Sequence, residues 1–325
     1  MNTSLRVRRR EKASDLLEMF GIALVAVVLF LLFSLFSPRF MTEGNLMNIV
    51  KQASIVAIMS IGMSFVFLIG GMDLSAGSNV FFSAVLLAVL LDLQVNVWAA
   101  MLVSVVACGV TGALNGIVIE GLKINCVIVT LGSQLAIRGL ALVIIEKFNS
   151  WIYVKDPVTK YVNTGKPFGL GLPTLLYAVA ALYLVAFLVL HRTSFGRQLY
   201  AVGGNPKAAR LCGFHAVKVK ALCYMVSGLA TGVAGIVTAC RLGMVTTTVG
   251  IGFEFDAVTA VVLGGMSLKG GEGSVIKTLV GALIVVMISN FMTLYGIDEN
   301  FKDAVTGLFI LAAVLFNRFT QREAA

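Results

Sequence analysis

The 325-residue chain has a net charge of +9, with 58% hydrophobic and only 13% charged residues. That charged fraction is about half of what a soluble domain carries, and apolar runs of about 18 to 22 residues recur along the chain. As helices, such runs can cross a hydrocarbon core of about 30 Å, and lipid admits only helices or closed barrels because it offers no partners to open backbone groups. We therefore predict an all-α polytopic membrane protein, whose positive charge reflects the positive-inside bias rather than nucleic-acid binding.

The N-terminal segment RVRRREKASD precedes an apolar run from Leu16 to Phe36. This run is longer than the apolar part of a signal peptide, and LFSPRF offers no small-x-small cleavage site. We expect it to be a retained first span with a cytoplasmic N-terminus. The complete set of candidate spans is 16–37, 49–70, 74–92, 97–119, 126–145, 173–190, 221–240, 256–268, 275–293 and 302–317.

About ten spans place both termini in the cytoplasm and predict one permease domain over residues 1–325. The span at 256–268 is short and Gly-terminated, which suggests a broken or re-entrant element. Basic residues occur in most of the segments predicted to be cytoplasmic, which supports this orientation. Among the outer segments, the loop at 146–172 is also basic, with four Lys. That loop is expected to form a surface lid, and we find no ATPase phosphate loop in the sequence.

Two similar turns follow apolar runs: IGGMDLSAGSNV at 69–80 and LGGMSLKGGEGSV at 263–275. Paired glycines permit positive φ and close helix approach. Asp73 and Ser75 occupy positions where N-cap acceptors of the next helix belong. A polar turn at membrane depth can also line a substrate route, and the two interpretations are compatible.

Polar side chains inside the predicted spans are candidates for the translocation path. Arg138 would cost about 2.5–3.5 kcal/mol at a helix centre, so it should face protein, water or an interface. Gln134, Ser133 and Thr130 lie on or near the same helical face. Asn115 and Asn290 are further candidates, and for each residue interhelical hydrogen bonding is the structural alternative.

The sequence shows no catalytic nucleophile–base pair and no metal-ligand spacing. The five cysteines are expected to be small hydrophobic core residues. Runs of Asp, Glu or His through the spans are lacking, which disfavours a proton relay but leaves a sodium-driven mechanism open.

A basic segment at 191–220 contains six Lys or Arg and no Asp or Glu. Within it, Asn205 can cap a helix that starts at Pro206 and stops at Gly213. The two alanines, Ala208 and Ala209, would form a small knob able to enter a groove on another protein. A charged loop near anionic lipid explains the basic residues equally well.

Three motifs resemble the bacterial ABC importer permeases of the monosaccharide branch (ribose, xylose and galactose type). They are GGMDLSAGS, the segment GNPKAARLCGFHAVKVKALCYMVSGLATGVAGI and the block GFEFDAVTAVVLGGMSLKGGEGSVIKTLVGALI. The resemblance extends from about Phe40 to Phe316. It implies an ATPase-coupling helix, with Asn205, Lys207, Ala208, Ala209, Arg210 and Gly213 as the corresponding residues. The family often has Glu where this chain has Lys207, so the ATPase should differ to match or the contact should be weaker.

By that resemblance the chain would be a permease subunit of the bacterial inner membrane that imports a small sugar by alternating access. Its partners would be a separate ATPase that binds MgATP, a second permease copy or paralogue, and a periplasmic or extracellular sugar-binding protein. The chain itself would hold no cofactor. Two alternatives stay open: an ABC permease for branched-chain amino acids or nucleosides, and a stand-alone secondary transporter.

Overall fold

The computed structural model describes residues 20–169, 171–298, 301 and 304–308. Six helices in this part are long and apolar enough to cross a membrane. They are α2 (Glu43–Leu68), α4 (Val97–Leu122), α5 (Cys126–Glu146), α7 (Thr174–Arg192), α10 (Ala216–Leu242) and α12 (Val275–Leu294). The prediction of a polytopic helical membrane protein is confirmed at this level.

Two shorter apolar helices, Phe20–Phe36 and α3 (Ala76–Asp92), and the short helix α11 (Phe253–Leu263) accompany them. At 1.5 Å per residue, the 11 residues of α11 cover only about half of a hydrocarbon core, as expected for the short span at 256–268. The count of ten spans and the side of the termini stay predictions, because residues 1–19 and most of 302–317 lie outside the described part.

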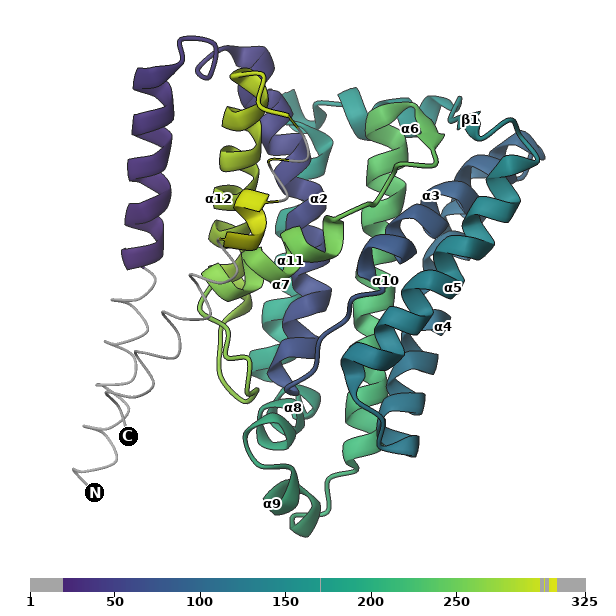
Figure 1. Ribbon diagram of the computed structural model, residues 1–325, viewed down its shortest axis with the longest axis vertical. Coiled ribbons are helices and arrows are strands. Elements are labelled where there is room, and N and C mark those ends of the chain that lie inside the picture. Colours follow the sequence, from purple (N-terminus) through teal and green to yellow (C-terminus); the bar gives the residue numbers. More distant parts are fainter. Residues whose placement is uncertain (1–19, 170, 299–300, 302–303, 309–325) are drawn as a thin grey trace.

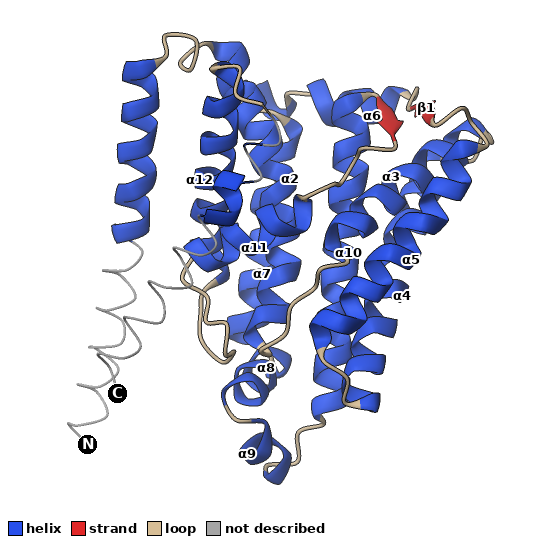
Figure 2. Cartoon of the chain, in the orientation of Figure 1, coloured by secondary structure: helices blue, strands red, loops and turns tan. Residues whose placement is uncertain are grey.

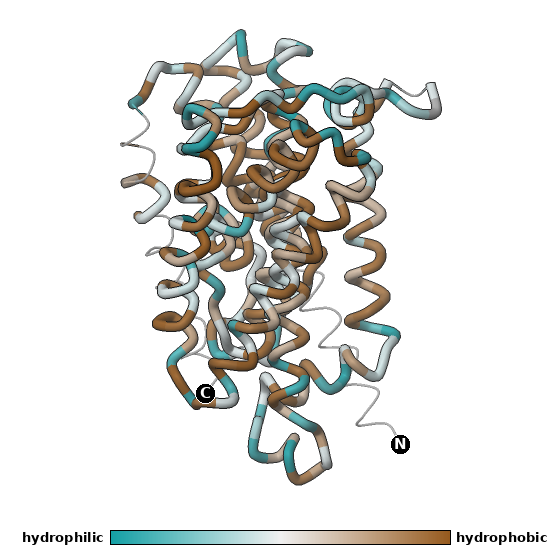
Figure 3. The backbone as a smooth tube through the Cα atoms, turned by 90° about the vertical axis from the view of Figure 1, so that its right-hand side faces the viewer, coloured by the Kyte–Doolittle hydropathy of each residue, from teal (hydrophilic) through white to brown (hydrophobic). Residues whose placement is uncertain are grey.

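The long helices stand side by side, and most connecting segments lie at the two ends of the bundle, whereas the links from α2 to α3 and into α11 run through its middle (Figure 1). At one end lie α8 (Ser194–Gly204) and α9 (Pro206–Leu211), and at the other end lie α6 (Pro157–Thr164) and β1 (Trp151–Tyr153). Hydrophilic residues concentrate toward both ends, with hydrophobic residues between them (Figure 3). The predicted inner segment 191–220 and outer loop 146–172 therefore occupy opposite ends.

The fold includes one small sheet that the all-α prediction missed (Figure 2). β1 pairs antiparallel with β2 (Met244–Thr246), so that Trp151 lies opposite Thr246. Each strand has only three residues. That length is too short for the alternation of apolar and polar residues by which a strand is recognised in a sequence.

Helix α2 occupies the core, and every residue from Ser54 to Leu68 is buried. Helices α4 and α10 approach each other closely through glycines. A Cβ added at Gly112 would lie 2.1 Å from the carbonyl oxygen of Tyr224, and one at Gly228 would lie 2.0 Å from that of Cys108. Only glycine permits this backbone-to-backbone packing.

Candidate translocation and coupling sites

A buried polar network surrounds Asp73, in the turn that joins α2 to α3. The Asp73 carboxylate accepts hydrogen bonds from the Ser75 backbone N–H at 3.1 Å, the Ser75 hydroxyl at 2.5 Å and the Ser227 hydroxyl at 2.7 Å. Because Ser227 belongs to α10, the turn is fixed to the helix that packs against α4. All three residues are fully buried.

The network continues into α4 and α5. The Asn115 side-chain amide donates to the Ser75 hydroxyl at 3.1 Å, and the Ser133 hydroxyl donates to the Asn115 side-chain oxygen. The structure thus brings together Asp73, Ser75 and Asn115, three of the residues selected from sequence for the translocation path.

The predicted capping role of this turn is wrong in its details. Ser75 does hold the N-cap position of α3, but its side chain caps no backbone N–H of that helix. The hydroxyl instead donates to Asp73, which is the stronger acceptor because it can carry a full negative charge.

A second polar cluster joins α5 to the start of α11. Gln134 donates to a carboxylate oxygen of Glu254 at 2.8 Å. Arg138 donates to the backbone carbonyl of Thr247 at 2.7 Å and lies 5.0 Å from the ring centroid of Phe81. As expected, the buried part of Arg138 faces protein, and its partners are backbone oxygen and an aromatic face.

Asn290 lies apart from both clusters. It exchanges two hydrogen bonds, at 3.0 and 2.9 Å, with Asn45 at the start of α2. Paired amides of this kind tie one helix to another, and the structure places no other candidate path residue beside them.

The basic segment forms the predicted short helix, α9. The Asn205 side chain accepts hydrogen bonds from the backbone N–H groups of Lys207 and Ala208 at 3.1 and 3.0 Å, and Pro206 opens the helix. The helix ends at Leu211, and Gly213, two residues later, has a φ of +84°, the left-handed conformation that glycine adopts without strain. The cap residue Asn205, the first helical residue Pro206 and the terminating Gly213 were all predicted from the sequence.

The predicted alanine knob needs correction. Ala208 is exposed, but Ala209 is buried against the rest of the chain and belongs to the hydrophobic core. The prominent apolar group on the outer surface of α9 is Leu211, which is 91% exposed. Two consecutive helical residues point about 100° apart, so both alanines cannot face the same partner.

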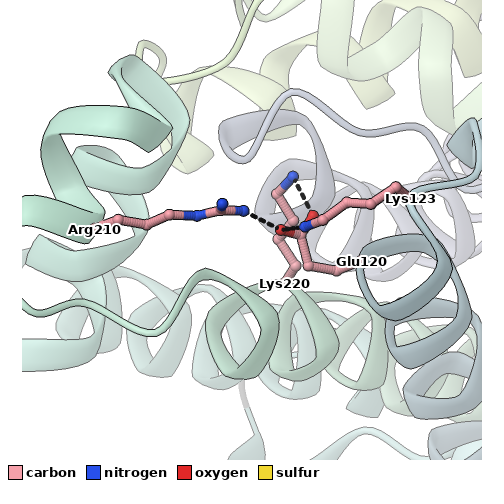
Figure 4. Close-up of polar contacts among 4 residues, drawn as sticks. All are labelled: Glu120, Lys123, Arg210 and Lys220. Carbon is pink, nitrogen blue, oxygen red and sulfur yellow. Dashed lines mark hydrogen bonds and ion pairs between the residues drawn. The ribbon is translucent and has the colours of Figure 1, made fainter.

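Glu120, in the last turn of α4, binds three basic side chains (Figure 4). One carboxylate oxygen lies 2.6 Å from Lys123 Nζ and 2.8 Å from Arg210 of α9, and the other lies 2.9 Å from Lys220 Nζ of α10. The Glu120 side chain is only 6% exposed. We refer to these four residues as the Glu120 cluster.

A family model described as "Branched-chain amino acid transport system / permease component" matches residues 45–314. The ribose import permease protein RbsC of Escherichia coli K12 is 36% identical over 297 residues, which cover 91% of this chain and 92% of that protein. The L-arabinose transport system permease protein AraH of the same organism is 34% identical over 305 residues (94% and 92%). The chain belongs to this ABC permease family. RbsC of Bacillus subtilis 168 is also similar, with 32% identity over 317 residues (96% of each protein).

Comparison with solved structures found no match. The relatives place this permease in the monosaccharide branch of the family, as the three sequence motifs indicate.

The two Gly-Gly-Met turns of the permease meet at the end of the bundle that bears the basic segment 191–220. The Gly271 N–H donates to the carbonyl oxygen of Leu68 at 2.8 Å. A Cβ on Gly203, near the end of α8, would lie 1.8 Å from the same oxygen and 2.7 Å from the Gly271 nitrogen. The basic segment therefore packs backbone to backbone against both turns at Gly203.

Three residues of these clusters were not predicted from the sequence. Glu254 precedes the predicted span at 256–268, although the acidic residues after Gly252 are typical of a helix start. Glu120 lies just beyond the predicted span at 97–119, and its partners Arg210 and Lys220 lie 90 and 100 residues away. Ser227 carried no signal, because serine is common on helix interfaces in membranes.

Proposed function

We propose that this permease is the membrane-spanning subunit of an ATP-driven ABC importer for a monosaccharide in the bacterial inner membrane. The supporting observation is that relatives named for ribose and arabinose import align with more than 90% of the chain. ATP would bind, with Mg²⁺, to a separate ATPase subunit. A second permease copy or a paralogue would complete the pore, and a sugar-binding protein would deliver the substrate.

The geometry favours this mechanism in two places. Helix α9 stands beyond the end of the bundle and exposes Leu211, Ala208 and Lys207 (Figure 1). An apolar anchor ringed by basic groups suits a partner groove that is apolar inside and acidic at its rim. The buried amides, hydroxyls and carboxylates around Asp73 and Gln134 can exchange hydrogen bonds with a neutral polyol.

In the alternating-access cycle that we infer, closure of the ATPase dimer displaces α9. The displacement changes the packing of the helices that hold the polar clusters, and the substrate route opens to the other side. The chain supplies hydrogen-bond donors and acceptors along that route and performs no chemistry on the sugar.

The first test is reconstitution of the wild-type permease with its ATPase and binding protein in liposomes. We expect uptake of labelled ribose or arabinose that requires ATP, with no uptake of leucine. Uptake by the permease alone under an ion gradient would overturn the proposal in favour of a secondary transporter, and uptake of leucine would favour an amino-acid importer.

A substitution tests the docking role of α9. We expect Leu211→Glu to lower the amount of ATPase that co-purifies with the permease by about tenfold or more, because it places a charge in a desolvated contact. Leu93→Glu changes a similarly exposed leucine, 64% accessible, near the opposite end and serves as the control. Equal ATPase recovery with both variants would rule out Leu211 as an anchor.

A further inference from the structure

The Glu120 cluster joins three elements that are far apart in sequence. Arg210 lies on the coupling helix α9, and Lys220 lies in the first turns of α10. Glu120 lies in the last turn of α4, and Lys123 follows that helix directly. In the part of the chain that the structure describes, the Arg210–Glu120 pair is the ion pair that connects α9 to a spanning helix. A buried carboxylate that holds a cation is costly to separate from it, so the bonded groups tend to move together.

Helices α4 and α10 behave as one body at this point. Their backbones touch at Gly112 and Gly228, where no side chain separates them, and Lys220 bonds them again through Glu120. A force applied at Arg210 therefore acts on both helices together.

The same two helices also hold the polar network. Asn115 lies five residues before Glu120 on α4, and Ser227 lies seven residues after Lys220 on α10. These side chains bond Ser75 and Asp73. A continuous path of hydrogen bonds, ion pairs and helix backbone thus runs from α9 to the turn between α2 and α3.

We propose that Glu120 is a positioning residue that transmits the displacement of α9 to α4 and α10 and so links ATP hydrolysis to sugar movement. This inference rests on the proposed function, since it requires an ATPase that moves α9. It differs from a docking role because the Glu120 side chain is only 6% exposed and bonds Arg210 of α9 and Lys220 of α10 within the same chain.

The experiment measures sugar transported per ATP hydrolysed, and ATPase co-purification, in proteoliposomes that contain the complete importer. We expect Arg210→Gln to lower the transport-to-hydrolysis ratio by about tenfold while the ATPase still co-purifies. Arg210→Lys retains the charge and should restore most of the ratio. Because the Arg210 side chain is 54% exposed, these variants should fold even if Glu120→Gln does not.

Lys123→Gln provides the matched comparison. It removes one cation from the same carboxylate oxygen, but Lys123 follows α4 directly and connects it to no other element. We expect its ratio to stay within about twofold of wild type.

The outcomes separate the two proposals. A wild-type importer without ATP-dependent uptake would overturn the proposed function and this inference with it. A wild-type importer that works, together with an unchanged ratio in Arg210→Gln, would overturn the role of Glu120 alone. Equal losses in Arg210→Gln and Lys123→Gln would also overturn it, because they would indicate a general effect of charge on the cluster.

Discussion

At the scale of single residues, Asp73 shows how a carboxylate can be buried in this fold. Its donors are two hydroxyl groups and one backbone N–H, and among the described residues it has no ion-pair partner. Hydrogen bonds from three neutral donors compensate part of the cost of removing the charge from water. The same bonds fix the unwound turn against α10.

Asp73→Ala should destabilise the protein, because Ser227 and Ser75 lose the acceptor of their buried donors. We expect a loss of about 1–3 kcal/mol, seen as a fall of several degrees in the thermal unfolding midpoint of the detergent-purified protein. Asp73→Asn keeps one acceptor oxygen and should lose less.

The exposed Asp92, at the end of α3, provides the comparison. Asp92→Ala should shift stability by less than about 0.5 kcal/mol. If Asp73→Ala were no less stable than Asp92→Ala, the hydrogen bonds to Asp73 would not support the turn.

At the scale of secondary-structure elements, hydropathy predicted the existence of the helices better than their ends. Helix α2 begins at Glu43, six residues before the predicted span, and α10 begins at Ala216, five residues before its span. The added residues include Asn45 and Asn48 in α2, and Lys218 and Lys220 in α10. Polar residues can extend a helix beyond lipid, and a hydropathy pattern does not register them.

Some residues of the candidate sites could also be predicted from sequence, and others could not. Polar residues inside apolar runs could be selected from sequence, as Asn115, Gln134 and Arg138 were, and the cap signals of α9 are local. The partners Ser227 and Glu254 could not, because their contacts span 154 and 120 positions and depend on how the helices pack.

The α4–α10 contact gives a prediction at this scale. Gly112→Val should force the helices apart, since even its Cβ would meet a backbone carbonyl. Overpacking of this kind costs about 1–3 kcal/mol, so we expect a lower thermal midpoint and reduced transport.

Gly121→Val is the control on the same helix, because a Cβ there meets nothing within 4 Å. A thermal midpoint for Gly112→Val equal to that of Gly121→Val would show that the helices can separate at little cost.

At the scale of the whole molecule, the two ends of the bundle differ in what they expose. Of the five cysteines, all described, Cys108, Cys223 and Cys240 are buried and Cys126 is partly buried. Cys212 is exposed beside α9, so the expectation that all five are core residues is wrong for this one. Its thiol is a native site for chemical labelling at the end of the molecule that bears α9.

A membrane-impermeant maleimide should therefore label Cys212 in inverted membrane vesicles and not in intact spheroplasts. In a Cys212→Ser background, Lys160→Cys on the exposed surface of α6 should show the opposite pattern. Labelling of Cys212 from the outside would reverse the proposed orientation and place α9 beyond the reach of a cytoplasmic ATPase.

The small sheet at the other end has a consequence for recognition kinetics. Pairing of β1 with β2, together with the Asp156 cap of α6, gives the segment 151–164 a defined shape in the absence of a partner. Ordering a free segment of that length would cost conformational entropy at each encounter and weaken the complex. In the transport cycle proposed above, the sugar-binding protein would meet a preorganised surface, and this segment would not have to fold at each encounter.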